Sequence, residues 1–271
     1  MVRARGGQVV DVVQGGAAEV GSEDWHVTFR VSRYKRDGQL PRWQDFTLVV
    51  RPTEYVVDAL ERIWAEHDRS LVFRHACHHA ACGACGVRIS GHEQLACITR
   101  IDTLVGDGGT IAIEPLRRLP VVSDLVVDVA PFYRRMERIP FVVLRSAAPI
   151  TDEETGTTGV GGPPPQQFEN CIECALCFSA CPVTGTNPDW VGPAALAAMS
   201  RMMEEPRAEL MSRSLFEWGT GRGSVAERVR EAGDGVFLCL LCRACEASCP
   251  AGVPITEGIH QLRRFLLKEG W

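Results

Sequence analysis

The chain has 271 residues, a formal net charge of −5 and a sequence pI of about 5.8. That acidic balance gives no electrostatic reason to expect a nucleic-acid partner. No apolar run reaches the roughly 18 residues that a membrane-spanning helix needs, and the N-terminus lacks the apolar core of a signal peptide. The twelve cysteines fall into three tight groups. This clustering favours metal binding in a reducing compartment, because the cysteines of disulfide-bonded secreted domains are usually scattered.

The first half of the chain predicts a small α+β domain spanning residues 23–130. Residues 1–22 are Gly-rich and unpatterned, so we expect a tail there. Alternating apolar residues at 25–33 and an apolar run at 44–50 predict the two strands of a hairpin. The apolar side of the first strand carries Trp25, Val27, Phe29 and Val31.

A helix is predicted to follow the hairpin, with Thr53 as its N-cap and residues 54–67 as its body. Its buried face would carry Val56, Leu60, Ile63 and Trp64. Residues 111–115 predict one further short strand, because their apolar residues alternate.

The second half predicts a helical domain spanning residues 131–271. Residues 150–168 are rich in Gly, Thr and Pro and are expected to form a linker or a long loop. A helix is predicted to begin at Pro193, because proline suits the first position of a helix. Residues 254–270 predict a final helix. The buried face of that helix would carry Ile255, Ile259, Leu262 and Leu266.

Two short segments share one cysteine pattern: CIECALCFSACP at 171–182 and CLLCRACEASCP at 239–250. In bacterial ferredoxins such a run gives three thiolates to one cubane cluster, and its fourth cysteine binds the other cluster. Each run is therefore incomplete alone. One predicted [4Fe–4S] site has the ligands Cys171, Cys174, Cys177 and Cys249. The other predicted site has Cys181, Cys239, Cys242 and Cys245. Structural zinc is the alternative, but zinc sites do not need three thiolates at this spacing with a fourth and a proline behind them.

The earlier cysteine group predicts a third site. Its spacing, C-x4-C-x2-C with a distant fourth cysteine, is that of plant-type [2Fe–2S] ferredoxins. The ligands would be Cys77, Cys82, Cys85 and Cys97. His75, His78 and His79 crowd the first ligand and are expected to be surface groups or neighbours of the ligands, because four cysteines already suffice.

No catalytic residue is predicted. The sequence shows no Gly-rich nucleotide loop, no Ser-His-Asp grouping and no carboxylates paired for acid–base work. The chain is therefore expected to carry electrons rather than to transform a substrate.

The order of the three sites resembles the iron–sulphur subunits of succinate dehydrogenase and fumarate reductase. Beyond the cysteines, four segments are similar to that family: LACIT at 95–99, CIECALC at 171–177, NPDWVGPAAL at 187–196 and DGVF at 234–237. The resemblance implies a plant-ferredoxin-like β-grasp domain followed by a helical bacterial-ferredoxin-like domain. It also implies a role in respiratory complex II and the tricarboxylic acid cycle, relaying electrons between the FAD of a flavoprotein subunit and a membrane-anchor subunit. The chain would then lie peripherally on the cytoplasmic face of a bacterial inner membrane, held by its partners.

Two departures from the family refine this expectation. Many members end in a [3Fe–4S] cluster because the position of Cys242 is not cysteine; its presence here favours a second [4Fe–4S] cluster, with [3Fe–4S] as the alternative. Many members also place tryptophan and histidine beside quinone, where this chain has Thr184–Thr186 and Leu240. This makes a quinone contact from the chain doubtful and suits the branch whose membrane subunit is a dihaem cytochrome b.

A different class of function is also compatible with the cysteine pattern. The chain could be a soluble ferredoxin-like carrier or the electron-transfer subunit of another flavoenzyme. Association with a flavoprotein and a cytochrome b distinguishes these alternatives.

Overall fold

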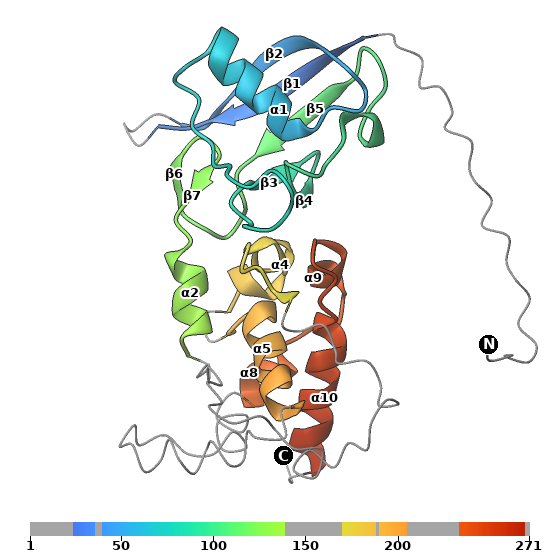
Figure 1. Cartoon of the computed structure of the whole chain (residues 1–271). Coiled ribbons are helices and arrows are strands. Elements are labelled where there is room, and N and C mark those ends of the chain that lie inside the picture. The colour runs from blue at the N-terminus through green and yellow to red at the C-terminus, as the bar shows by residue number, and fades with distance from the viewer. Residues whose placement is uncertain (1–23, 36–39, 139–169, 188–189, 205–232, 269–271) are drawn as a thin grey trace, which may run out of the picture.

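The computed structural model describes residues 24–35, 40–138, 170–187, 190–204 and 233–268. The predicted tail at 1–22 and the predicted linker at 150–168 lie outside these ranges. Figure 1 shows the described part as a sheet-containing half and a helical half. The predicted α+β class with a β-grasp-like first half and a helical second half is confirmed.

The first half is built on a mixed five-stranded sheet in the order β2-β1-β5-β3-β4. Its strands are β1 (Trp25–Arg33), β2 (Arg42–Val50), β3 (Gly86–Ile89), β4 (His92–Leu95) and β5 (Thr110–Glu114). The predicted hairpin is confirmed, with β1 and β2 antiparallel and Phe29 opposite Phe46. β5 lies parallel to β1 on its other side, so the chain must cross over between them. The crossover contains the first cysteine group.

Helix α1 (Val56–Arg62) covers the sheet and continues as a π-helical turn over Ile63–His67. The predicted N-cap, Thr53, is wrong: the N-cap is Tyr55, whose backbone N–H donates to the Asp58 carboxylate at 3.0 Å. Trp64 was also expected on the buried face, yet it is 41% exposed. The π-helical turn changes the spacing of side chains there, and the ring packs under the Arg69 guanidinium at 4.3 Å.

Several elements have no counterpart in the sequence prediction. β3 and β4 form a hairpin whose turn residues, Ser90 and Gly91, both have positive φ. A second small hairpin contains β6 (Val121–Ser123) and β7 (Val126–Val127). Short 3₁₀ turns lie at Ile101–Thr103 and Val183–Gly185. Helix α2 (Ala130–Met136) then leads out of the sheet half.

The helical half contains the two repeated cysteine runs and the helices around them. These are α4 (Leu176–Ala180), α5 (Pro193–Glu204), α8 (Gly233–Phe237), α9 (Ala244–Ala247) and α10 (Ile255–Lys268). The predicted starts of α5 and α10 are confirmed within one residue, and the predicted apolar face of α10 is buried. Among the described residues, no helix combines the length and apolar character needed to cross a bilayer.

A buried polar network joins the two halves. Ser179 of α4 is fully buried and donates to the Glu93 carboxylate of β4 at 3.0 Å. The same hydroxyl accepts the backbone N–H of Arg117 at 2.8 Å, and the Arg117 guanidinium pairs with Glu93 at 3.2 Å. Beyond the sheet half, Arg135 of α2 donates to the Trp190 carbonyl at 2.8 Å and so ties α2 to the segment before α5. Because unpaired buried polar groups are costly, this network fixes how the cysteine loops of the two halves meet.

Candidate metal centres

The first cysteine group converges into one site at the edge of the sheet. The thiols of Cys77 and Cys82 lie close enough to affect each other's ionisation, as do those of Cys85 and Cys97. Cys82 also lies close enough to Cys85 for their charges to interact. Cys85 and Cys97 are buried, whereas Cys82 is exposed, so the site has one inner side and one side open to solvent.

The eight remaining cysteines form two interleaved sites. Cys249, from the second run, lies among Cys171, Cys174 and Cys177 of the first run, and together they line one cavity. Cys181, from the first run, lies with Cys239, Cys242 and Cys245 of the second run, and they line another. The structure thus brings together the same sets of four that the ferredoxin pattern predicted.

The two cysteine runs repeat the same backbone conformation. In the first run, φ is 54° at Glu173 and 62° at Ala175, the two residues on either side of Cys174. In the second run the residues on either side of Cys242 have φ of 52° at Leu241 and 61° at Arg243. Ala175 and Arg243 are the N-caps of α4 and α9, with ψ of 8° in both. Non-glycine residues rarely adopt this conformation, yet both runs adopt it at the same two positions. Cys242 therefore has the same position in the second loop that Cys174 has in the first.

Burial opposes ionisation of the inner thiols. It raises the pKa of Cys174 to about 11 and the pKa values of Cys85 and Cys245 to about 12. The pKa of Cys177 lies well above its usual value because of burial and, after that, the charges of neighbouring thiolates. At the exposed edge, the backbone N–H of His79 lowers the pKa of Cys77 to about 6. Four thiolates can share these buried positions when a bound cation compensates their charge.

Other groups around the cavities also fit a sulphur-containing cluster. Backbone N–H groups donate to the thiols of Cys77, Cys239 and Cys249 at 3.3–3.4 Å. Trp190 is fully buried and lines the cavity that contains Cys181, but its indole N–H has no acceptor within the described residues. A cluster bound there brings sulphide acceptors of the kind that this donor needs.

Arg263 of α10 holds the loop of the last site. Its guanidinium donates to the carbonyls of Val236 and Phe237 at 3.3 Å and to that of Cys239 at 2.5 Å. Because these bonds reach the chain just before and at the first cysteine of the second run, Arg263 fixes where that run begins.

The first two sites are in direct contact through Gly83. A Cβ atom at this glycine would lie 2.7 Å from the Cβ and 2.9 Å from the Cα of Cys174. Gly83 also has φ of +69°, which side chains disfavour. The glycine between Cys82 and Cys85 therefore lets the loop of the first site approach the loop of the second.

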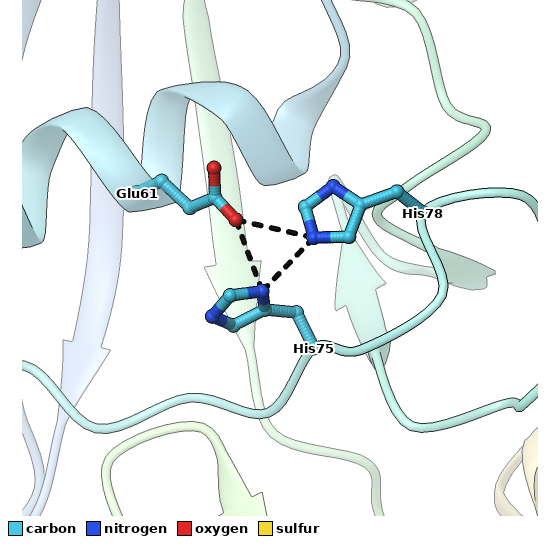
Figure 2. A group of neighbouring side chains, drawn as sticks. All are labelled: Glu61, His75 and His78. Carbon is cyan, nitrogen blue, oxygen red and sulfur yellow. Dashed lines mark hydrogen bonds and ion pairs between the residues drawn. The ribbon is translucent and has the colours of Figure 1, made fainter.

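Sequence reasoning did not single out Glu61. Figure 2 shows its carboxylate on α1 pointing toward the rings of His75 and His78, which flank Cys77. His79, the third histidine of the loop, is not part of this group. No motif of fixed spacing could have indicated it, because Glu61 lies on a helix and the histidines lie on a loop that follows it.

Comparison with known proteins identifies the family. A family described as "2Fe-2S iron-sulfur cluster binding domain" matches residues 28–134, and one described as "4Fe-4S dicluster domain" matches residues 167–253. The chain is 32% identical over 256 residues to the fumarate reductase iron–sulphur subunit of Mycobacterium tuberculosis, covering 90% of this chain and 98% of that protein. The chain belongs to the family of succinate dehydrogenase and fumarate reductase iron–sulphur subunits.

Two further matches extend this result. A mitochondrial succinate dehydrogenase iron–sulphur subunit of Oryza sativa is 31% identical over 252 residues, covering 86% of this chain and 75% of that protein. A chain of the Mycobacterium smegmatis Sdh1 complex in the apo form has the same fold, with a TM-score of 0.73 at 24% identity over 91% of this chain and 98% of that one. The chain is thus an electron-transfer subunit of an oxidoreductase, with [2Fe–2S] and [4Fe–4S] cofactors.

The contact at Gly83 makes a testable prediction. Gly83→Ala should lower the iron content and the thermal midpoint of the anaerobically purified protein. Backbone strain at the positive φ and overpacking against Cys174 each cost about 1–3 kcal/mol. Gly108→Ala is the matched control, since Gly108 has φ of +75° but nothing within 4 Å of an added Cβ. Equal effects of the two substitutions on iron content would show that the contact with Cys174 is unimportant.

Proposed function

We propose that this chain relays electrons between a FAD-containing flavoprotein subunit and a membrane-anchor cytochrome b of a succinate:quinone oxidoreductase or fumarate reductase. The supporting observation is that the three sets of four cysteines form a continuous series. Gly83 joins the first set to Cys174 of the second, and Cys177 of the second lies close enough to Cys245 of the third for their charges to interact. Family membership supports the choice of enzyme.

Each set of cysteines is proposed to hold one cluster. Cys77, Cys82, Cys85 and Cys97 would hold [2Fe–2S]. Cys171, Cys174, Cys177 and Cys249 would hold [4Fe–4S]. Cys181, Cys239, Cys242 and Cys245 would hold the third cluster. Iron–sulphur clusters accept and release single electrons at potentials that depend on cluster type, hydrogen bonds to sulphur and exposure. The chain supplies the thiolates, the backbone N–H donors and the burial.

The third cluster is proposed to be [4Fe–4S] rather than [3Fe–4S]. The conformation around Cys242 matches that around Cys174, and Cys242 lines the same cavity as the other three cysteines of its set. Four thiolates in one set are what a complete cubane needs. A three-iron cluster would leave the Cys242 thiol without iron.

The membrane partner is proposed to be of the dihaem type, with quinone bound there and not by this chain. Thr184 is buried, and Leu240 is exposed but has no polar side-chain atom to offer a quinone. The complex would hold the chain on the cytoplasmic face of a bacterial inner membrane. The proposed domain boundary near residue 130 falls where α2 leaves the sheet half.

Purification of the tagged chain from detergent-solubilised membranes of its host tests this function. We expect a flavoprotein and a b-type cytochrome to co-purify with it, with two haems per chain by a pyridine haemochrome assay. Recovery of the chain as a lone soluble protein without flavin would contradict the proposed complex, and one haem per chain would contradict the dihaem assignment.

Electron paramagnetic resonance of the oxidised, anaerobic protein tests the type of the third cluster. A [3Fe–4S] cluster is paramagnetic when oxidised, whereas an ordinary [4Fe–4S] cluster is silent, so we expect no strong signal near the free-electron position. Cys242→Ser should lower the iron content or create such a signal, because it alters one proposed ligand. A strong signal in the unmodified protein that Cys242→Ser leaves unchanged would overturn the proposal.

A further inference from the structure

Glu61, His75 and His78 bring three metal-ligating atoms together outside the cysteine sites. Glu61 Oε1 lies 3.0 Å from His75 Nδ1 and 3.2 Å from His78 Nε2. The two histidine nitrogens are 3.0 Å apart. Figure 2 shows the three side chains pointing toward a common centre, the carboxylate from α1 and both rings from the loop that contains Cys77.

Hydrogen bonds alone cannot satisfy this triangle of atoms. The carboxylate oxygen only accepts, and each of the two ring nitrogens carries at most one proton. If both nitrogens donate to Glu61, two N–H groups face each other across 3.0 Å. If one nitrogen donates to the other, the accepting nitrogen carries no proton there, and its lone pair faces the carboxylate oxygen, which is also an acceptor. A cation between the three atoms satisfies all of them, because each then directs a lone pair at it.

The distances and ring orientations also suit a metal ion. Zinc–nitrogen and zinc–oxygen bonds of about 2.0–2.2 Å, at the angles of tetrahedral or octahedral coordination, place neighbouring ligand atoms about 2.8–3.6 Å apart. The His75 and His78 rings meet at an interplanar angle of 81°, so they approach the centre from different directions. Phe73 stacks on His75 with centroids 5.1 Å apart and helps to orient that ring.

We propose that Glu61, His75 and His78 bind one divalent transition-metal ion of the zinc type, separately from the iron–sulphur clusters. Two imidazoles and one carboxylate are a common ligand set for such ions and leave further positions for water. His75 and Glu61 are more than a third exposed at their side chains, so the ion can enter from solvent. The bound ion would join α1 to the loop on both sides of Cys77 and restrain that loop.

Zinc binding to the full chain with its clusters assembled tests this site. The anaerobic protein is first passed over a chelating resin to remove loosely bound metal and is then dialysed against buffered free Zn²⁺. Bound zinc and iron are measured by mass spectrometry. We expect one zinc per chain with the iron content unchanged. X-ray absorption at the zinc edge should show only nitrogen and oxygen ligands at about 2.0–2.2 Å. A sulphur ligand at about 2.3 Å would place the zinc on cysteines and overturn the proposal.

Single substitutions assign the ligands. His75→Ala, His78→Ala and Glu61→Ala should each weaken zinc binding by about tenfold or more. His79→Ala is the matched control and should bind zinc as the unmodified chain does, because His79 lies in the same loop but outside the group. If a histidine variant loses its [2Fe–2S] signal, Glu61→Ala decides, since Glu61 lies on α1 outside the cysteine loop. Equal zinc affinity in Glu61→Ala and His79→Ala would overturn the proposal.

Discussion

The structure depends on the burial of sulphur ligands from segments that are distant in sequence. Cys181 of the first run lines the cavity formed by the second run, and Cys249 of the second run lines the cavity formed by the first. Burial raises the pKa values of the inner thiols, so a fold that gathers them without metal stabilises the neutral thiols and not the thiolates. In the proposed clusters, bound iron would reverse this preference, because its charge would compensate the thiolates and it would link the two runs to each other.

The remaining contacts position these sulphur ligands relative to one another. Gly83 allows the loop of the first site to touch Cys174, and the buried pair of Ser179 with Glu93 holds α4 against β4. Arg263 fixes the start of the second run by binding three backbone carbonyls. Figure 1 shows the result: α4 and α9 lie at the end of the helical half that faces β3 and β4. An electron-transfer subunit needs this arrangement, because its sites must lie near one another in a defined order.

Features with a local signal could be predicted from the sequence. β1 and the buried face of α10 follow directly from the spacing of apolar residues, and the three cysteine sets follow from motif spacing. The features that sequence reasoning placed wrongly or did not find depend on tertiary structure. Trp64 was placed by ideal helical spacing, which the π-helical turn after Arg62 changes. No motif indicates that Arg135 binds the Trp190 carbonyl, because the two residues are far apart in sequence. The group of Glu61 with two histidines depends on how a loop returns to α1, and no local pattern encodes that.

Serine substitution of the crossing cysteines tests the interleaved arrangement most directly. Reduced and oxidised anaerobic samples of Cys249→Ser are compared by electron paramagnetic resonance and iron content with two reference variants, Cys174→Ser and Cys245→Ser. The interleaved arrangement predicts that Cys249→Ser affects the same cluster as Cys174→Ser and leaves the one affected by Cys245→Ser assembled. A Cys249→Ser spectrum that instead matches Cys245→Ser would mean that each run ligates its own cluster, and the account would be contradicted.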